Sequence, residues 1–136
     1  MLTVRDIMTP DVYTVETDAS AEEAAWGLTR RHIGGAPVRD ATGDLVGVVT
    51  TSDLVNPEPA HWIRGDAKVE DLMNPDVLGL CADDPALSAA IGMAQHNIHR
   101  VVVMDEQGRM AGIVTAFDIV KAVAAGLDFG VRGGDR

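Results

Sequence analysis

The chain has 136 residues, of which 46% are hydrophobic and 4% aromatic, and its formal net charge is −10. This length suits one compact unit with an aliphatic core and is short for a multidomain enzyme. The negative charge repels nucleic-acid backbones and anionic membranes, so we expect neither as a partner. The sequence holds no apolar run of signal-peptide length and none of about 18 residues, which predicts a cytoplasmic protein.

Cysteine and histidine patterns give no sign of a metal or a disulfide. Cys81 is the single cysteine, which excludes an internal disulfide, and no Cys/His cluster has the spacing of a zinc site. We expect no metal ligands, and we expect Cys81 to be a small apolar residue that is buried or half-buried.

An internal repeat organises the chain. Aligning Met8-Thr9-Pro10 with Met73-Asn74-Pro75 pairs residues 4–55 with residues 69–120 without a gap, and roughly 20 of about 50 positions are identical. Such agreement indicates a tandem duplication of one supersecondary unit. With two copies only, an open solenoid is not expected, and we predict a pseudo-symmetric pair whose copies pack on each other through their sheets.

Each copy is predicted to fold as β-α-β-β-α after a leading helical turn, an α+β architecture. Thr3 and Asp66 are expected to cap the leading helices, while Ser20, in a capping box with Glu23, and Asp84 are expected to cap the central ones. Gly126 is the expected C′ glycine of the last helix. The expected helices of the first copy cover 4–8, 20–32 and a short segment after 50, and its strands 12–15, 36–39 and 45–50. In the second copy the expected helices cover 67–73, a segment that begins at 84 and ends at the position aligned with residue 32, and a segment that ends at 125. Its expected strands cover 77–80, 101–104 and 110–115.

The repeat and the proline positions divide the chain into four parts. Residues 1–57 form motif 1, and residues 58–66, with His61 and Trp62, form a linker, because Pro57 and Pro59 cannot continue a helix. Residues 67–127 form motif 2, and residues 128–136 are expected to be a disordered tail.

Both copies contain the motif Gly-h-h-Thr-x-x-Asp, where h is an apolar residue, at Gly47–Asp53 and Gly112–Asp118. Each motif reads as the end of a buried strand that runs into a helix, where backbone N–H groups without partners favour a phosphate. The threonine adds a hydroxyl donor, and the aspartate can accept both hydroxyls of a ribose. The same spacing also describes a capping box that binds nothing, and the two roles can coexist.

With the repeat, the β-α-β-β-α order and the two motifs in register, the sequence resembles the CBS (cystathionine beta-synthase) domain family. More specifically, it resembles a stand-alone tandem pair, called a Bateman module. The Met-x-Pro openings and the segment Gly35-Ala36-Pro37-Val38 agree with this, and the resemblance extends from Val4 to about Ala125.

The resemblance implies a non-catalytic regulatory module that binds adenosine-type ligands (AMP, ADP or ATP) in clefts between the two motifs and signals by conformational change. It implies no obligatory cofactor; the adenine nucleotide is a regulatory ligand read by an unknown protein effector. The implied ribose and phosphate residues are Thr50, Asp53, Thr115 and Asp118. The implied adenine cage and its phosphate neighbours are Thr14, Val15, Gly35, Ala36, Pro37, Leu80, Arg100, Val101 and Val102.

The two copies differ at several of these positions. Val102 matches Pro37, Gly79 matches Thr14, and His99-Arg100 matches Gly34-Gly35. Arg100 and His99 either pair with phosphate or lie in an exposed helix-to-strand loop. If they pair with phosphate, the two sites are unequal, one neutral and one cationic.

The remaining expectations concern partners and rival functions. The last helix carries a wide apolar stripe and the central helices are rich in Ala and Gly, which favours a homodimer through helical faces. The alternatives are a structural dimerisation module without a physiological nucleotide, or a binder of S-adenosylmethionine or an NAD-type ligand. We expect no enzyme, because no nucleophile-base pair, Walker motif or Rossmann glycine pattern is present.

Overall fold

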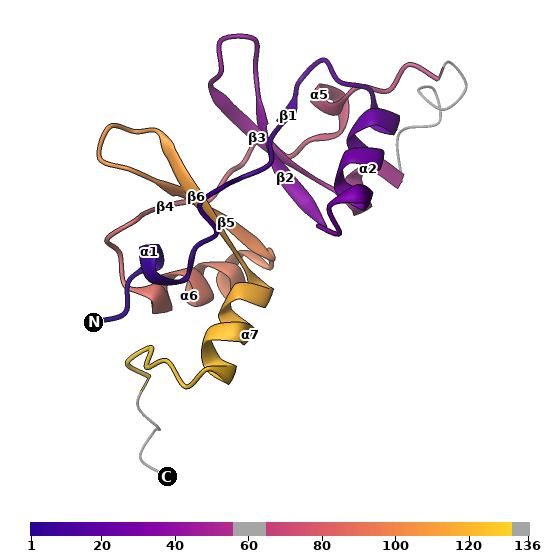
Figure 1. Ribbon diagram of the computed structural model, residues 1–136. Coiled ribbons are helices and arrows are strands. Elements are labelled where there is room, and N and C mark those ends of the chain that lie inside the picture. Colours follow the sequence, from indigo (N-terminus) through magenta and orange to yellow (C-terminus); the bar gives the residue numbers. More distant parts are fainter. Residues whose placement is uncertain (56–64, 132–136) are drawn as a thin grey trace. The chain divides into compact units, whose positions relative to one another are not determined.

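The structure is a computed structural model and describes residues 1–55 and 65–131 (Figure 1). It contains helices and two three-stranded sheets, in the orders β1-β2-β3 and β4-β5-β6. The predicted α+β architecture, with two β-α-β-β-α motifs, is therefore confirmed. The elements of the first sequence repeat are α1 (Val4–Ile7), β1 (Val15–Glu16), α2 (Ala21–Arg30), β2 (Gly35–Arg39), β3 (Leu45–Thr50) and α3 (Thr51–Val55). The remaining elements are α5 (Val69–Leu72), β4 (Gly79–Cys81), α6 (Ala86–His96), β5 (Arg100–Met104), β6 (Met110–Thr115) and α7 (Ala116–Ala124).

The two sheets have the same topology and register. In each, the first strand pairs parallel with the second, and the second pairs antiparallel with the third. Both antiparallel pairs contain a register shift at the matched positions Val38/Arg39 and Val103/Met104. The duplication seen in the sequence thus extends to backbone irregularities.

The chain divides into two compact units. One unit is Val12–Val77, which we call the Thr50 unit; the other joins Met1–Asp11 to Leu78–Arg136, and we call it the Thr115 unit. Each unit has its own aliphatic core between its sheet and its helices. Each compact unit therefore combines the first segment of one sequence repeat, which contains its leading helix, with the body of the other repeat. The two repeats thus exchange their leading segments.

The exchange places each leading helix on the body of the other repeat. In the Thr115 unit, α1 packs against α6, where Val4 is fully buried and its N–H donates to the carbonyl of Asp84 at 2.8 Å. In the Thr50 unit, α5 packs against α2, and fully buried Val69 donates to the carbonyl of Ala19 at 2.9 Å. Figure 1 shows indigo α1, the start of the chain, beside the much later helix α6.

Helix ends agree with the sequence only in part. The hydroxyl of Ser20 accepts the N–H of Glu23 at 3.0 Å, as predicted. Gly126 has φ +79° directly after the cap residue of α7, also as predicted. The predicted cap Asp66 is wrong, because α5 begins at Val69 with Lys68 as its cap.

The start of α6 and the environment of Cys81 also differ from expectation. Pro85 is the cap residue of α6, and the carboxylate of Asp84 accepts the backbone N–H of Cys81 at 2.9 Å instead of capping the helix. Cys81 is exposed, so the expected burial is wrong. The cysteine lies at the end of an edge strand, where one side chain in two faces away from the core.

Parts of two predicted segments lie outside the described residues. These are 56–64, which includes His61 and Trp62 of the predicted linker, and 132–136 of the predicted tail. Within the tail, Phe129 packs against the core of the Thr115 unit. Among the described helices, none has the length and apolar character that crossing a bilayer would require.

Candidate functional site

The first candidate junction lies where β3 runs into α3, in the Thr50 unit. The backbone N–H of Thr50 donates to Oδ2 of Asp53 at 2.8 Å, and the N–H of Asp53 donates to the Thr50 hydroxyl at 3.3 Å. This is the reciprocal capping box that the spacing predicted. Both side chains are half-buried. Oδ1 of Asp53 has no hydrogen-bond donor within the described residues, so one carboxylate oxygen is available to a ligand.

The second junction lies where β6 runs into α7, in the Thr115 unit, and has a matching capping box. The N–H and hydroxyl of Thr115 donate to Oδ2 of Asp118 at 2.8 and 3.1 Å, and the N–H of Asp118 donates back to the hydroxyl at 3.2 Å. Here Asp118 is buried, with only 7% of its surface exposed. Its Oδ1 lies 3.5 Å from the Thr9 hydroxyl and 3.4 Å from Nζ of Lys121. Both carboxylate oxygens of Asp118 therefore have contacts, whereas only one oxygen of Asp53 has a hydrogen-bond donor among the described residues.

The register of each sheet sets the neighbour of each threonine. Gly35 is the cross-strand partner of Thr50, and Arg100 is the cross-strand partner of Thr115. Directly opposite residues in an antiparallel pair have Cβ atoms about 4.5 to 5.5 Å apart, so the Arg100 side chain starts beside the Thr115 hydroxyl. The matched position of the Thr50 unit carries no side chain. The sheet register thus places an arginine opposite Thr115 and a glycine opposite Thr50.

The predicted adenine-cage residues divide between the two faces of each sheet. Successive strand residues point to opposite faces, and Val15, Ala36 and Val101 belong to the cores beneath the helices, against which Leu80 also packs. The opposite sheet face therefore carries the positions of Gly35 and Pro37 with Thr50, and of Arg100 and Val102 with Thr115. Thr14 precedes β1 and has no partner in the sheet register.

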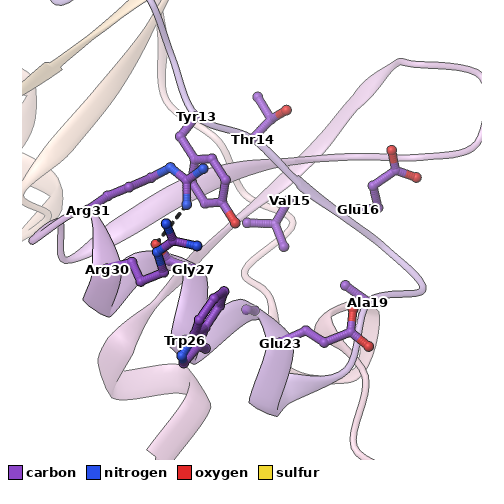
Figure 2. Close-up of a pocket in the computed structure, with 11 residues that line it drawn as sticks. Tyr13, Thr14, Val15, Glu16, Ala19, Glu23, Trp26, Gly27, Arg30 and Arg31 are labelled. Atoms are coloured by element: carbon purple, nitrogen blue, oxygen red, sulfur yellow. Dashed lines mark hydrogen bonds between the residues drawn. The ribbon is translucent and has the colours of Figure 1, made fainter.

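A pocket of about 410 Å³ lies between β1 and α2 in the Thr50 unit. Figure 2 shows Arg31 lying across the ring of Tyr13, with its guanidinium 3.8 Å from the ring centroid and Nη1 donating to the Gly27 carbonyl at 3.2 Å. An added Cβ on Gly27 would lie 2.2 Å from the Tyr13 hydroxyl oxygen, so this glycine provides room for the tyrosine. The described lining includes Thr14 and Val15 but not Thr50 or Asp53, so this pocket is separate from the junction.

Two residues at the second junction were not among the predicted site residues. Thr9 reaches Asp118 from the leading segment, and Lys121 lies one turn after Asp118 on α7. The i, i+3 spacing of Asp118 and Lys121 is a readable signal for an ion pair. Thr9 could be found only by knowing that the leading segment packs on the other repeat. Within residues 1–55 and 65–131, no group of three or more His, Cys, Asp or Glu could hold a metal ion.

Two matched strand-to-helix junctions, on two sheets of identical register, define a tandem module of two α+β motifs with one Thr-x-x-Asp junction in each. The CBS domain model matches residues 4–57 and again residues 69–125. The chain therefore belongs to the CBS domain family, as a tandem pair of two such motifs.

Solved CBS pairs have the same fold over nearly the whole chain. The CBS domain pair of protein MJ0100, solved with 5′-methylthioadenosine and S-adenosyl-L-methionine, is 30% identical with a TM-score of 0.80 and covers 93% of this chain and 98% of its own. The protein CBSX2, solved with AMP, is also 30% identical with a TM-score of 0.80 and covers 92% of this chain and 98% of its own.

Curated relatives are longer proteins. Homoserine O-acetyltransferase of Methanococcoides burtonii is 33% identical over 88% of this chain and 24% of the relative. L-aspartate semialdehyde sulfurtransferase of Methanocaldococcus jannaschii is 33% identical over 85% of this chain and 22% of the relative. The chain thus spans about a quarter of the length of these two relatives.

Proposed function

We propose that this chain is a non-catalytic regulatory module that binds an adenosine-type ligand, with AMP, ADP and ATP as the favoured class. The observation that carries the proposal is the pair of Thr-x-x-Asp junctions in matched register, within a fold whose relatives at 30% identity were solved with AMP, 5′-methylthioadenosine and S-adenosyl-L-methionine. The site residues proposed to contact ribose and phosphate are Thr50, Asp53, Thr115 and Asp118.

Each group has a chemical role in this proposal. The aspartates accept hydrogen bonds from ribose hydroxyls, because an ionised carboxylate has only acceptor capacity. The threonine hydroxyls and the N–H groups at the start of α7 favour a 5′-phosphate. Arg100 adds a cation beside Thr115, and charged hydrogen bonds contribute about 1.5 to 3 kcal/mol each. The adenine lies against the aliphatic side chains on the same sheet face, Pro37 in one unit and Val102 in the other.

Regulation, rather than catalysis, follows from the family and from the kinds of groups at the junctions. CBS pairs generally act as regulatory modules, and the carboxylates of Asp53 and Asp118 are engaged with backbone N–H groups of their own helices. A carboxylate fixed in this way orients hydroxyls without needing to transfer a proton. In this proposal, a separate protein is the effector that responds to the bound ligand.

A second candidate is a module specialised for S-adenosylmethionine or its thioether product. The observation that favours it is Gly35, which leaves the Thr50 junction without the cation that Arg100 adds at the other junction. A ligand without phosphate needs no such cation. The third candidate is a structural dimerisation module, and it is favoured by the reciprocal capping boxes, which satisfy the motif residues without a ligand.

A thermal-shift panel with AMP, ADP, ATP, NADH, S-adenosylmethionine and 5′-methylthioadenosine separates these candidates. A ligand at about 100 times its dissociation constant adds roughly 2.7 kcal/mol of stability, or several degrees in the melting temperature. A shift with phosphorylated nucleotides supports the proposal, and a shift confined to the sulfur nucleosides supports the second candidate. The absence of a shift with all six compounds would leave only the structural module.

A further inference from the structure

Asp118 is the one buried charged side chain among the described residues, and its two oxygens have different contacts. Oδ2 is held at 2.8 and 3.1 Å by the N–H and hydroxyl of Thr115. Oδ1 has only long contacts, at 3.5 Å to the Thr9 hydroxyl and 3.4 Å to Nζ of Lys121. A ribose hydroxyl that donates to Asp118 must therefore use Oδ1, because Oδ2 is occupied by the capping box.

The backbone fixes Thr9 at this position. The N–H of Thr9 donates to the carbonyl of Ile113 at 2.8 Å, and the N–H of Ile113 donates back at 3.0 Å. The neighbouring Gly112 allows this approach, since an added Cβ there would lie 2.8 Å from the Thr9 carbonyl oxygen. The hydroxyl that faces Asp118 is thus carried by a segment paired to β6, and that segment leads through Pro10 and Asp11 into the Thr50 unit.

The Thr50 unit has the same backbone arrangement without the hydroxyl. Asn74 occupies the position that matches Thr9 and pairs with Val48 as Thr9 pairs with Ile113. The side-chain oxygen of Asn74 accepts the N–H of Asp76 at 2.9 Å, so it serves its own turn. Within the described residues, Oδ1 of Asp53 has no protein donor. The two junctions therefore form an internal comparison: one carboxylate oxygen is open and the other is in contact with the leading segment.

We propose that Thr9 is a specificity-determining residue of the Thr115 junction: its hydroxyl contacts the ribose-accepting oxygen of Asp118 and weakens ligand binding at this site. The inference rests on the proposed function, because it assumes that both aspartates accept ribose. A ligand at Asp118 displaces the Thr9 hydroxyl from Oδ1, whereas no hydrogen-bond donor within residues 1–55 and 65–131 has to leave Oδ1 of Asp53. One net hydrogen bond corresponds to roughly three- to tenfold in affinity.

Displacement also connects this site to the leading segment. Once the ribose hydroxyl replaces the Thr9 hydroxyl, the segment that carries Thr9 keeps its backbone pair with Ile113 but loses its side-chain contact with Asp118. Occupancy of the Thr115 junction is therefore coupled to how firmly residues 1–11 hold to this unit, whereas occupancy of the Thr50 junction is not coupled to them in this way.

The test is isothermal titration calorimetry with AMP on the full chain, the variant Thr9→Val and the hydroxyl-keeping control Thr9→Ser. Asp53→Asn and Asp118→Asn, titrated in parallel, assign each binding phase to its junction. Thr9→Val is expected to strengthen the Asp118 phase by roughly three- to tenfold and leave the Asp53 phase unchanged, and Thr9→Ser is expected to match the wild type.

Two outcomes would overturn the inference, and they are distinguishable from each other. An Asp118 phase that is unchanged or weaker in Thr9→Val refutes the role of Thr9 while leaving nucleotide binding intact. The absence of AMP binding in the wild type and in every variant refutes both the inference and the favoured ligand class. Circular dichroism of Thr9→Val confirms that the variant is folded.

Discussion

The two junctions share the Thr-x-x-Asp motif but differ in the single residues that lie beside it. Thr50 and Thr115 occupy the same place in their sheets, yet their cross-strand partners are Gly35 and Arg100. A guanidinium presents up to five N–H donors and remains charged at all physiological pH values. Under the proposed function, we therefore expect the Thr115 junction to favour a phosphorylated ligand and the Thr50 junction to accept an uncharged 5′ group.

Replacing Arg100 with alanine tests this distinction. We expect Arg100→Ala to reduce the affinity of the Asp118 phase for ATP by about tenfold or more, because a charged hydrogen bond is lost, and to change the affinity for 5′-methylthioadenosine little. Titration calorimetry with both ligands measures the ratio. Arg109→Ala is the matched control, since Arg109 is an exposed arginine in the β5–β6 turn. Equal losses for both ligands in Arg100→Ala would contradict a role in phosphate recognition.

Asp40 gives the β2–β3 turn a dependence on pH. Its carboxylate accepts the hydroxyl of Thr42 at 2.6 Å and the N–H groups of Thr42 and Asp44 at 2.9 and 3.0 Å. These bonds, the Thr42 hydroxyl first, lower the pKa of Asp40 below its ordinary value of 3.8. Because the folded-state pKa is the lower one, the stabilisation is present above pH 3.8 and is lost as the pH falls through the folded-state pKa.

An NMR titration of the side-chain carboxyl carbons measures this directly. In the wild type, we expect the midpoint of Asp40 below 3.8. In Thr42→Val, which removes the largest contribution, the midpoint is expected to move back toward 3.8. Chemical unfolding of Asp40→Asn should show a smaller loss of stability below pH 4 than the wild type, because the variant lacks the titrating group. A midpoint at or above 3.8 in the wild type would contradict the assignment.

At the level of elements, the glycine that begins each motif is explained by the exchange of leading segments. An added Cβ on Gly112 would lie 2.7 Å from Sδ of Met8 and 2.8 Å from the carbonyl oxygen of Thr9. On Gly47 it would lie 2.8 Å from the corresponding atoms of Met73 and Asn74. The leading segment thus crosses the third strand of each sheet at a distance that only glycine permits.

The variant Gly112→Ala is therefore expected to be destabilised by about 1 to 3 kcal/mol, since backbone as well as a side chain must move. Gly79→Ala is the matched control: it also lies in a strand, and the nearest atom to an added Cβ there is 3.8 Å away, in ordinary contact. Urea unfolding of both variants measures the difference. A Gly112→Ala variant as stable as Gly79→Ala would mean that the leading segment does not pack tightly on β6.

These elements also show what the sequence could predict. Aligning the two repeats at an offset of 65 residues (73 − 8) predicted where both strand-to-helix junctions lie. It also aligned Gly35 with Arg100, because register follows from matched strands and turns. The exchange of α1 and α5 could not be predicted, because each is a four-residue helix whose few apolar side chains do not specify which body they cover. The contact of Thr9 with Asp118 depends on that exchange. By contrast, the division of the predicted cage was readable, since Ala36 and Pro37 are consecutive in one strand and must face opposite sides.

For the whole molecule, the net charge of −10 and the exposed apolar side chains of α7 act in opposite directions on self-association. Phe117, Val120 and Val123 are 66%, 58% and 61% exposed, and Leu127 follows at 43%. Phe117, Val120 and Val123 lie three residues apart in succession on α7, so these three side chains form one stripe. An exposed apolar stripe of this kind is typical of an interaction surface, and we propose that α7 is part of a homodimer interface.

The substitution Val120→Glu tests the dimer by placing a charge in the middle of the stripe. If the stripe is buried between two copies, each dimer acquires two like charges near its symmetry axis, and an unpaired charge in an apolar interface costs several kcal/mol. We expect multi-angle light scattering to show a dimer for the wild type and a monomer for Val120→Glu at the same micromolar concentration. Gln95→Glu, on the exposed side of α6, adds the same charge and is expected to remain dimeric. A monomeric wild type, or a Val120→Glu variant that dimerises as well as Gln95→Glu, would exclude α7 as the interface, since the charge change is identical in the two variants.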